Sequence, residues 1–245
     1  VIDIYFYLTA SIGIIFFGIS KGGFAGPASI LAIPIMALNM NPVLAAGILL
    51  PILLIMDFLA LYVYWKKWDL KNVYTIIPPA VLGIFIGGIT FQYISADSIR
   101  IIVGTICISF VFLRLFQQNN IFFKPTLMKG RFWSMVSGYT STIIHAGGQP
   151  LSFYLLPQKL NKTTFVGTMT LVFLIINILK LIPYYLLDLL VVSNLKISLI
   201  LSPLAPISIY FGYVLHKRFN EETFYFLIYF LLGISGIKLI YDGIF

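Results

Sequence analysis

Two stretches decide the fold of this chain: Gly18-Ile19-Ser20-Lys21-Gly22-Gly23-Phe24-Ala25-Gly26-Pro27 and Gly138-Tyr139-Thr140-Ser141-Thr142-Ile143-Ile144-His145-Ala146-Gly147-Gly148-Gln149-Pro150. Both are glycine-rich and interrupt otherwise apolar sequence. Each carries one basic or titratable side chain, Lys21 in the first and His145 in the second. Paired helix breaks at corresponding places in two halves of a chain point to the binding site of a membrane transporter.

The composition around these stretches is that of an integral membrane protein. Of the 245 residues, 60% are hydrophobic and only 10% are charged, whereas a soluble domain carries about 25% charged residues. A membrane-spanning helix takes roughly 20 residues, which limits the chain to about eight to ten crossings. No stretch is polar enough to form a separate soluble domain, so we expect a single membrane domain over residues 1–245.

Charge and cysteine content exclude several functions. The net charge of +8 does not indicate nucleic-acid binding, because the basic residues sit in short loops between apolar runs. His145, His216 and Cys107 are too few and too far apart for a metal site, and the chain has no phosphate-binding loop. We therefore expect no metal, no cofactor and no enzymatic activity. The first residues, Val1-Ile2-Asp3, lack the basic region of a signal peptide.

Ten apolar runs organise the chain. Four are short and flank the two glycine-rich stretches, and six are long enough to span a membrane. A run of eight or thirteen residues cannot cross a hydrocarbon core of about 30 Å alone. We therefore expect each short pair to form a helical hairpin or broken helix whose tip lies within the membrane. The runs are 2–19, 24–38, 43–64, 73–94, 99–116, 132–144, 150–157, 163–187, 190–214 and 223–244.

A weak internal repeat relates the two halves. Several residues recur at a spacing of 120 positions, and further along the chain the spacing becomes 124. We expect repeat 1 over residues 1–120 and repeat 2 over 121–245, each with one broken-helix hairpin and three transmembrane helices. The matching pairs are Gly18 with Gly138, Gly47 with Gly167, Asp57 with Asn177, Pro79 with Pro203, and Arg114 with Lys238.

The distribution of charge predicts the topology. With the N-terminus outside, loops 65–72, 117–131, 158–162 and 215–222 face the cytoplasm and hold ten of the sixteen Lys and Arg residues. Both termini are then on the periplasmic side of a bacterial inner membrane. Each half contains five segments, an odd number, so the halves enter the membrane from opposite sides. The expected fold is all-α and polytopic, with two inverted repeats and a site at their interface.

Two ionisable residues lie at the predicted hairpin tips. Lys21 is a candidate for attracting an anionic substrate, beside the backbone N–H groups of Gly22 and Gly23; the alternative is a lysine that snorkels to a shallow loop. His145 is a candidate anion donor or proton carrier, and the alternative is a histidine satisfied by a neighbouring carbonyl. The second tip also offers the backbone N–H groups of Gly147 and Gly148 and the side chain of Gln149 as donors.

Two more ionisable residues lie inside spanning runs, where a charge needs a partner or a cavity. Asp57 is a candidate for binding a coupling proton or sodium ion, or else for a buried salt bridge. Asn177 and Lys180 share one helix face and are candidate substrate ligands; the alternative for Lys180 is snorkelling. Six small polar residues are weaker candidates for the pocket: Ser20, Thr140, Ser141, Thr142, Thr168 and Thr170.

The chain resembles the TauE/SafE sulfite-exporter family. The resemblance rests on Lys21-Gly22-Gly23-Phe24-Ala25-Gly26, His145-Ala146-Gly147-Gly148, Leu155-Leu156-Pro157-Gln158-Lys159-Leu160-Asn161-Lys162-Thr163, and Phe165-Val166-Gly167-Thr168 leading to Asn177-Ile178-Leu179-Lys180. It implies a bacterial inner-membrane permease for sulfite, sulfoacetate and related sulfonates. Family members commonly have a proline after the second Gly-Gly, where this chain has Gln149.

These observations lead to one functional hypothesis with open alternatives. A small oxyanion is expected between the two hairpin tips of a secondary carrier that works by alternating access. Lys21 and His145 would supply charge, Asn177 would orient the ligand, and Asp57 or His145 would couple a proton. The alternatives are a passive anion channel, a carrier of small carboxylates, cation transport through Asp57, or a membrane-embedded enzyme.

Overall fold

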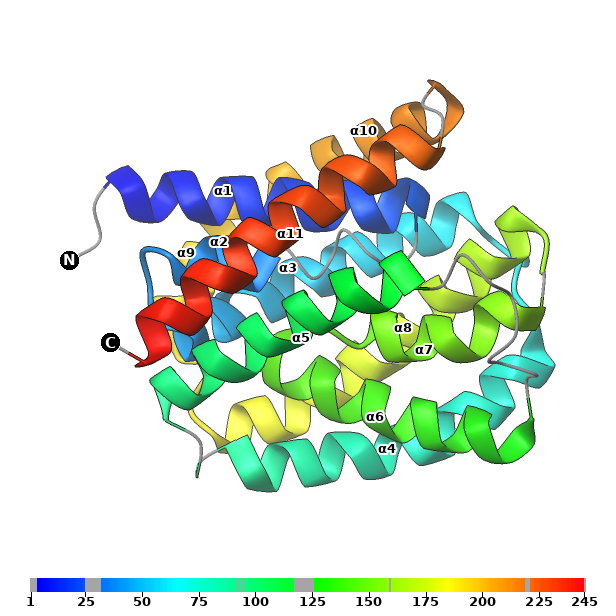
Figure 1. Cartoon of the computed structure of the whole chain (residues 1–245), viewed down its shortest axis with the longest axis horizontal. Helices are drawn as coiled ribbons and strands as arrows, with labels where there is room; N and C mark the ends of the chain where they lie inside the picture. The colour runs from blue at the N-terminus through cyan, green and yellow to red at the C-terminus, as the bar shows by residue number, and fades with distance from the viewer. Residues whose placement is uncertain are drawn as a thin grey trace.

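The computed structural model describes residues 4–24, 32–91, 93, 95–116, 126–158, 160–218 and 221–244. All regular elements in these ranges are helices, which confirms the predicted all-α fold (Figure 1). In chain order they are α1 (Ile4–Ile19), the π-helix η1 (Ser20–Phe24), α2 (Ala32–Ala37), α3 (Pro42–Val63), α4 (Leu70–Phe91), α5 (Ala96–Phe116), α6 (Leu127–Ile144), α7 (Gly148–Leu155), the 3₁₀-helix η3 (Leu156–Gln158), α8 (Lys162–Leu186), α9 (Val192–Leu201), α10 (Leu204–Arg218) and α11 (Glu221–Ile244).

Several of these helices are built to span a membrane. Among the described residues, four helical stretches are long and apolar enough: Ile4–Gly23, Pro42–Val63, Leu70–Phe91 and Thr163–Leu186. Large apolar side chains stand exposed on their outer surfaces, which suits a surface covered by lipid rather than water. The chain is therefore a multi-pass membrane protein.

The first glycine-rich stretch does not interrupt its helix where the sequence predicted. α1 continues directly into η1, so the helical segment reaches Phe24. The prediction that run 2–19 is too short to span is wrong, because Ile4–Gly23 has 20 residues. Close packing on α10 accounts for this: a methyl group added at Gly22 would come 2.3 Å from the carbonyl oxygen of Ile209. Residues 25–31 of the predicted return segment lie outside the described residues.

The second glycine-rich stretch forms the predicted hairpin. α6 ends at Ile144, and the φ of 54° at the next residue, His145, lies in the left-handed region and turns the chain. α7 then folds back along α6, because Gly147 lies against Ser137 near the turn and Gly130 lies against Tyr154 farther away. α6 begins at Leu127, five residues before the predicted run 132–144, because Lys129, Gly130 and Arg131 interrupt the apolar pattern but not the helix.

The predicted run 190–214 is not one straight helix. α9 and α10 meet at Ser202 and Pro203 with a bend of 45°. Proline lacks the N–H that would continue the helical ladder, which is a sufficient cause for the break. α4 holds Pro78 and Pro79 and nevertheless stays continuous over 22 residues.

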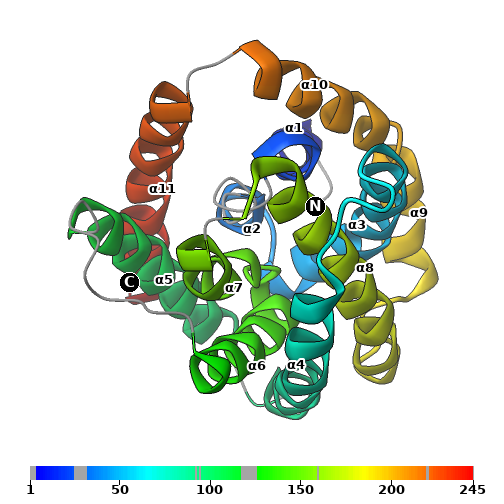
Figure 2. The ribbon, with the colours of Figure 1, turned by 90° about the vertical axis from the view of Figure 1, so that its right-hand side faces the viewer.

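Helices α3 and α8 run antiparallel through the core of the molecule. Gly167, near the start of α8, lies against Lys67 just after α3, whereas Gly47, near the start of α3, lies against Leu189 just after α8. Around this pair, α4 packs on α6, α10 packs on α1 and η1, and α5 packs on α11 (Figure 2). α1 begins and α11 ends at the same end of the molecule (Figure 1).

Candidate functional site

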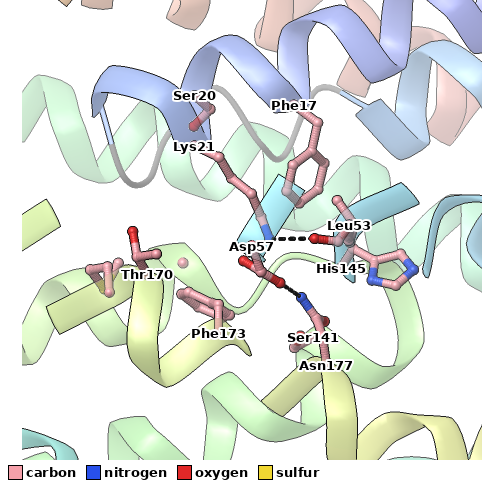
Figure 3. A pocket seen from close by; sticks show the side chains of 12 residues that line it. Phe17, Ser20, Lys21, Leu53, Asp57, Ser141, His145, Thr170, Phe173 and Asn177 are labelled. Atoms are coloured by element: carbon pink, nitrogen blue, oxygen red, sulfur yellow. Dashed lines mark hydrogen bonds and ion pairs between the residues drawn. The ribbon is translucent and has the colours of Figure 1, made fainter. Parts of the chain in front are cut away.

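A pocket opens where α1, η1, α3, α6, α7 and α8 meet. One part of its wall is apolar, and another part presents ionisable and amide side chains (Figure 3). The wall combines segments from both halves of the chain, as expected for a site between the two predicted repeats. The lining residues are Phe17, Ser20, Lys21, Leu53, Asp57, Ser141, His145, Gly148, Met169, Thr170, Phe173 and Asn177.

Asp57 is the acidic centre of this pocket. Its Oδ1 forms an ion pair with Nζ of Lys21, and its Oδ2 accepts a hydrogen bond of 2.6 Å from Nδ2 of Asn177. Lys21 also donates to the backbone oxygen of Leu53 at 3.5 Å. The salt-bridge alternative for Asp57 is therefore what the structure contains, and snorkelling of Lys21 is wrong because its ammonium group turns inward to the carboxylate.

Lys180 lies behind the pocket wall with none of its surface exposed. Its Nζ contacts Nδ1 of His145 at 2.6 Å, Oδ1 of Asn177 at 3.1 Å and Oγ of Ser141 at 3.3 Å. Snorkelling of Lys180 is therefore wrong. The side chain is not part of the lining and reaches the pocket only through its three partners, all of which line it.

His145 connects the second hairpin to the other half of the chain. Its Nε2 lies 3.0 Å from the backbone oxygen of Ala46 in α3 and 3.4 Å from Oη of Tyr184. The ring is thus satisfied by a neighbouring carbonyl, as one of the two sequence interpretations held. It also lines the pocket, so a role in substrate binding stays a prediction.

Of the four glycines predicted to offer backbone N–H groups to a ligand, one lines the pocket and three do not. Gly148 is the first residue of α7 and lines the pocket. Gly22 and Gly23 are buried inside η1 and are not among the lining residues. Gly147 is also outside the lining, and its carbonyl oxygen accepts a hydrogen bond of 2.7 Å from Ser137. The side chain of Gln149 lies outside the described residues.

Sequence reasoning missed the apolar part of the wall. Of the small polar candidates, Ser20, Ser141 and Thr170 line the pocket, whereas Thr140, Thr142 and Thr168 do not. An apolar residue gives no signal of its own in a chain that is apolar throughout. Three of them could have been found by spacing, because Phe17, Leu53 and Phe173 each precede a predicted site residue by four positions and so share its helix face. The residues missed are Phe17, Leu53, Met169 and Phe173.

The fold and this pocket define a class: a polytopic helical membrane protein with a buried, ionisable binding site. Within the described part of the chain, no group of three or more His, Cys, Asp or Glu residues gathers that could hold a metal ion. The family model described as sulfite exporter TauE/SafE matches residues 11–239. The chain belongs to this family, whose members are membrane transporters of sulfur anions. Comparisons with curated proteins and with solved structures gave no match.

Proposed function

We propose that this protein is a secondary transporter that carries small sulfur-containing anions, such as sulfite or organosulfonates, across the bacterial inner membrane. One observation carries the proposal: Lys21, Asp57, His145 and Asn177 converge on a single pocket in a chain that is otherwise strongly apolar. Ionisable residues inside a membrane are costly and mark substrate or ion pathways. The family membership supports a sulfur anion as the substrate.

The pocket lining also suits an organosulfonate in particular. Such a molecule has a charged sulfonate group at one end and a carbon chain at the other. Phe17, Leu53 and Phe173 offer apolar surface for the carbon chain close to the polar groups of Lys21 and Asn177 (Figure 3). Binding sites for small molecules are usually built in this way, from apolar walls and a few placed polar groups.

Each polar residue of the pocket has a role in this proposal. Lys21, held by Asp57, directs a remaining N–H towards the anion. Gly148 contributes the backbone N–H at the start of α7, and Asn177 orients the ligand. Asp57 or His145 binds the proton that is carried with the anion. In this proposal the other predicted ligands bind the anion only through neighbouring groups or in another conformation of the transport cycle. They are Gly22, Gly23, Gly147, Gln149 and Lys180.

Many carriers that work by alternating access are built from two inverted repeats, and a repeated hydrogen bond supports such a repeat in this chain. Tyr64 donates through Oη to the backbone oxygen of Gly22 at 3.0 Å. Tyr184 donates through Oη to the backbone oxygen of Thr142 at 2.6 Å. Both donors and both acceptors are 120 positions apart, the spacing that relates Gly18 to Gly138. The same contact therefore occurs once in each half.

Helix packing supports the same relation. α10 of the second half packs on α1 of the first half, and α4 of the first half packs on α6 of the second half. Two glycines make these approaches possible: an added methyl group would come 2.4 Å from the backbone oxygen of Ile19 at Gly212, and 3.2 Å from that of Tyr139 at Gly87. Ile19 and Tyr139 are again 120 positions apart.

The position of charged residues supports the proposed orientation. The turn after α3, the start of α6 and the end of α10 lie together at the end of the molecule opposite the start of α1 (Figure 1). These segments carry Lys66, Lys67, Lys129, Arg131 and Arg218. Positively charged loops remain in the cytoplasm, which supports a periplasmic position for both termini in this proposal.

Two measurements test this function. The purified protein in detergent is heated with sulfite, methanesulfonate, sulfate, acetate or chloride, and a sulfur anion should raise the unfolding temperature more than acetate does. Proteoliposomes loaded with the best anion should then exchange it against labelled external anion. Stabilisation by acetate alone would indicate that the substrate is a carboxylate and not a sulfur anion. Flux without counterflow would indicate a channel and not a carrier.

A further inference from the structure

The polar network behind the pocket contains a lysine without a carboxylate partner. Among the described residues, no Asp or Glu lies within ion-pair distance of Lys180. Its Nζ is surrounded instead by Ser141, His145 and Asn177, and its side chain is fully buried. Lys21 differs from it, because Lys21 is paired with Asp57.

The neighbouring groups fix where the hydrogens of this network lie. A carboxylate only accepts, so Asn177 must turn Nδ2 to Asp57 and Oδ1 to Lys180. A backbone carbonyl also only accepts, so His145 carries its hydrogen on Nε2, facing Ala46, and presents the lone pair of Nδ1 to Lys180. Nζ of Lys180 thus meets two obligate acceptors and one hydroxyl, and an ammonium group in this place could donate one N–H to each of the three.

The charges of the network balance without Lys180. Lys21 is positive and Asp57 is negative in their ion pair, and His145 with one ring hydrogen is neutral. Tyr184, whose ring lies 5.5 Å from Nζ of Lys180, donates its hydrogen to a carbonyl and is neutral as well. A proton on Lys180 would therefore add one surplus positive charge to the network, which is costly unless an opposite charge approaches it.

We propose that Lys180 is protonated when an anion occupies the pocket, that its ammonium group supplies one matching positive charge from behind the wall, and that the pocket therefore selects anions with a single negative charge. This inference rests on the proposed function and names the charge class of its substrate. Ser141 and Asn177 both bind Lys180 and line the pocket, so the charge lies one side chain away from the ligand. A singly charged sulfonate or hydrogensulfite brings the site to neutrality, whereas sulfate leaves it negative unless a proton is taken up.

The test compares two anions that match in size and shape but differ in charge. Methanesulfonate and sulfate are both tetrahedral at sulfur, and a methyl group in one replaces an oxygen in the other. Titration of the purified wild-type protein at neutral pH and constant ionic strength should give an affinity for methanesulfonate at least about tenfold higher than for sulfate. Equal or tighter binding of sulfate would overturn the charge selectivity. Absence of binding by every sulfur anion would overturn the proposed function together with it.

A lysine substitution locates the charge. Lys180→Met should weaken methanesulfonate binding by about tenfold or more, because a hydrogen-bonded charge near the ligand is lost. Lys196→Met, on the exposed surface of α9, is the matched control and should bind as the wild type does. A folded Lys180→Met variant with wild-type affinity would show that Lys180 is not the matching charge. The wild-type comparison of the two anions does not depend on the folding of this variant.

Discussion

The two glycine-rich stretches look equivalent in sequence but differ in backbone. The first stays helical through the π-helix η1, and the second stops at the left-handed residue His145 and reverses into α7. Their polar side chains differ in reach as well. Lys21 binds Asp57 within its own half, whereas His145 contacts Ala46 in the other half. A glycine-rich stretch thus predicts where the backbone can depart from a regular α-helix, and the packing around the stretch determines which conformation it adopts.

The same comparison separates the two buried lysines. Lys21 and Lys180 come from different halves and approach the same amide–carboxylate pair, Asn177 and Asp57. Among the described residues, only the first forms an ion pair with a carboxylate. The polar contacts of the two lysines are therefore different although both converge on the same pair of side chains.

The largest loss of stability is expected from substitution of Asp57, which contacts Asn177 of the other half. Asp57→Leu should lower the free energy of unfolding by about 3–5 kcal/mol, because it leaves Lys21 buried without its partner. Asn177→Leu, at the related position, should cost about 1–3 kcal/mol, since it breaks hydrogen bonds but no ion pair. Chemical unfolding in detergent measures both. The double variant Lys21→Met with Asp57→Leu is the control and should recover part of the loss; equal losses in the two single variants would contradict the asymmetry.

A smaller effect is expected at the paired glycines. An added methyl group at Gly138 would come 2.1 Å from the backbone oxygen of Ala80, and one at Gly18 would come 1.8 Å from Oγ and 2.5 Å from Cβ of Ser208. Rotation of the serine would move Oγ but not Cβ, so neither contact can be relieved by a side chain alone. Gly138→Ala and Gly18→Ala should therefore each cost about 1–3 kcal/mol. Unfolding temperatures of the two variants measure the loss, and an unchanged temperature in either variant would contradict the close packing at that glycine.

The tyrosine pair should respond equally in both halves. Tyr64→Phe and Tyr184→Phe each remove one hydrogen bond to a backbone carbonyl, to Gly22 and Thr142 respectively. Each substitution should cost about 1 kcal/mol. Thermal unfolding of the two variants, with Tyr62→Phe on the exposed surface as control, measures the loss. A loss in only one half would argue against the repeated contact.

The smallest effect is expected at two turns. Lys66 follows α3 with φ of 59°, and Asp188 follows α8 with φ of 53°. This left-handed conformation costs a non-glycine residue about 1–2 kcal/mol, part of which glycine loses again through its greater freedom in the unfolded chain. Lys66→Gly and Asp188→Gly should each stabilise the protein by less than about 1 kcal/mol. Destabilisation by either glycine in unfolding experiments would show that the side chain itself holds the turn.

Much of the fold could be predicted from patterns of glycine, proline and charge. The helical hairpin at Gly138–Pro150 and the meeting of Lys21, Asp57, His145 and Asn177 in one place were both predicted, since a buried charge in a membrane needs a partner. The repeat spacing gave the pairing of Asp57 with Asn177 as related positions, but not their direct contact.

Other features depend on tertiary contacts that a single sequence does not contain. η1 remains helical because α10 packs against Gly18 and Gly22, and no local pattern reports that packing. Lys180 precedes a proline near a helix end, which suggested a snorkelling side chain; its burial follows from His145, which is 35 positions away. The bend at Pro203 differs from the continuous helix at Pro79, although the two prolines are related by the repeat spacing.

The contact between Asp57 and Asn177 bears on the proposed repeat. If the halves are inverted copies, this position lies on the axis that relates them, because each residue touches its own counterpart. An exact copy would place the same residue on both sides of the axis. Two aspartates in contact could not both be ionised. A single chain that holds both copies could keep an acid at one position and an amide at the other, as Asp57 and Asn177 do.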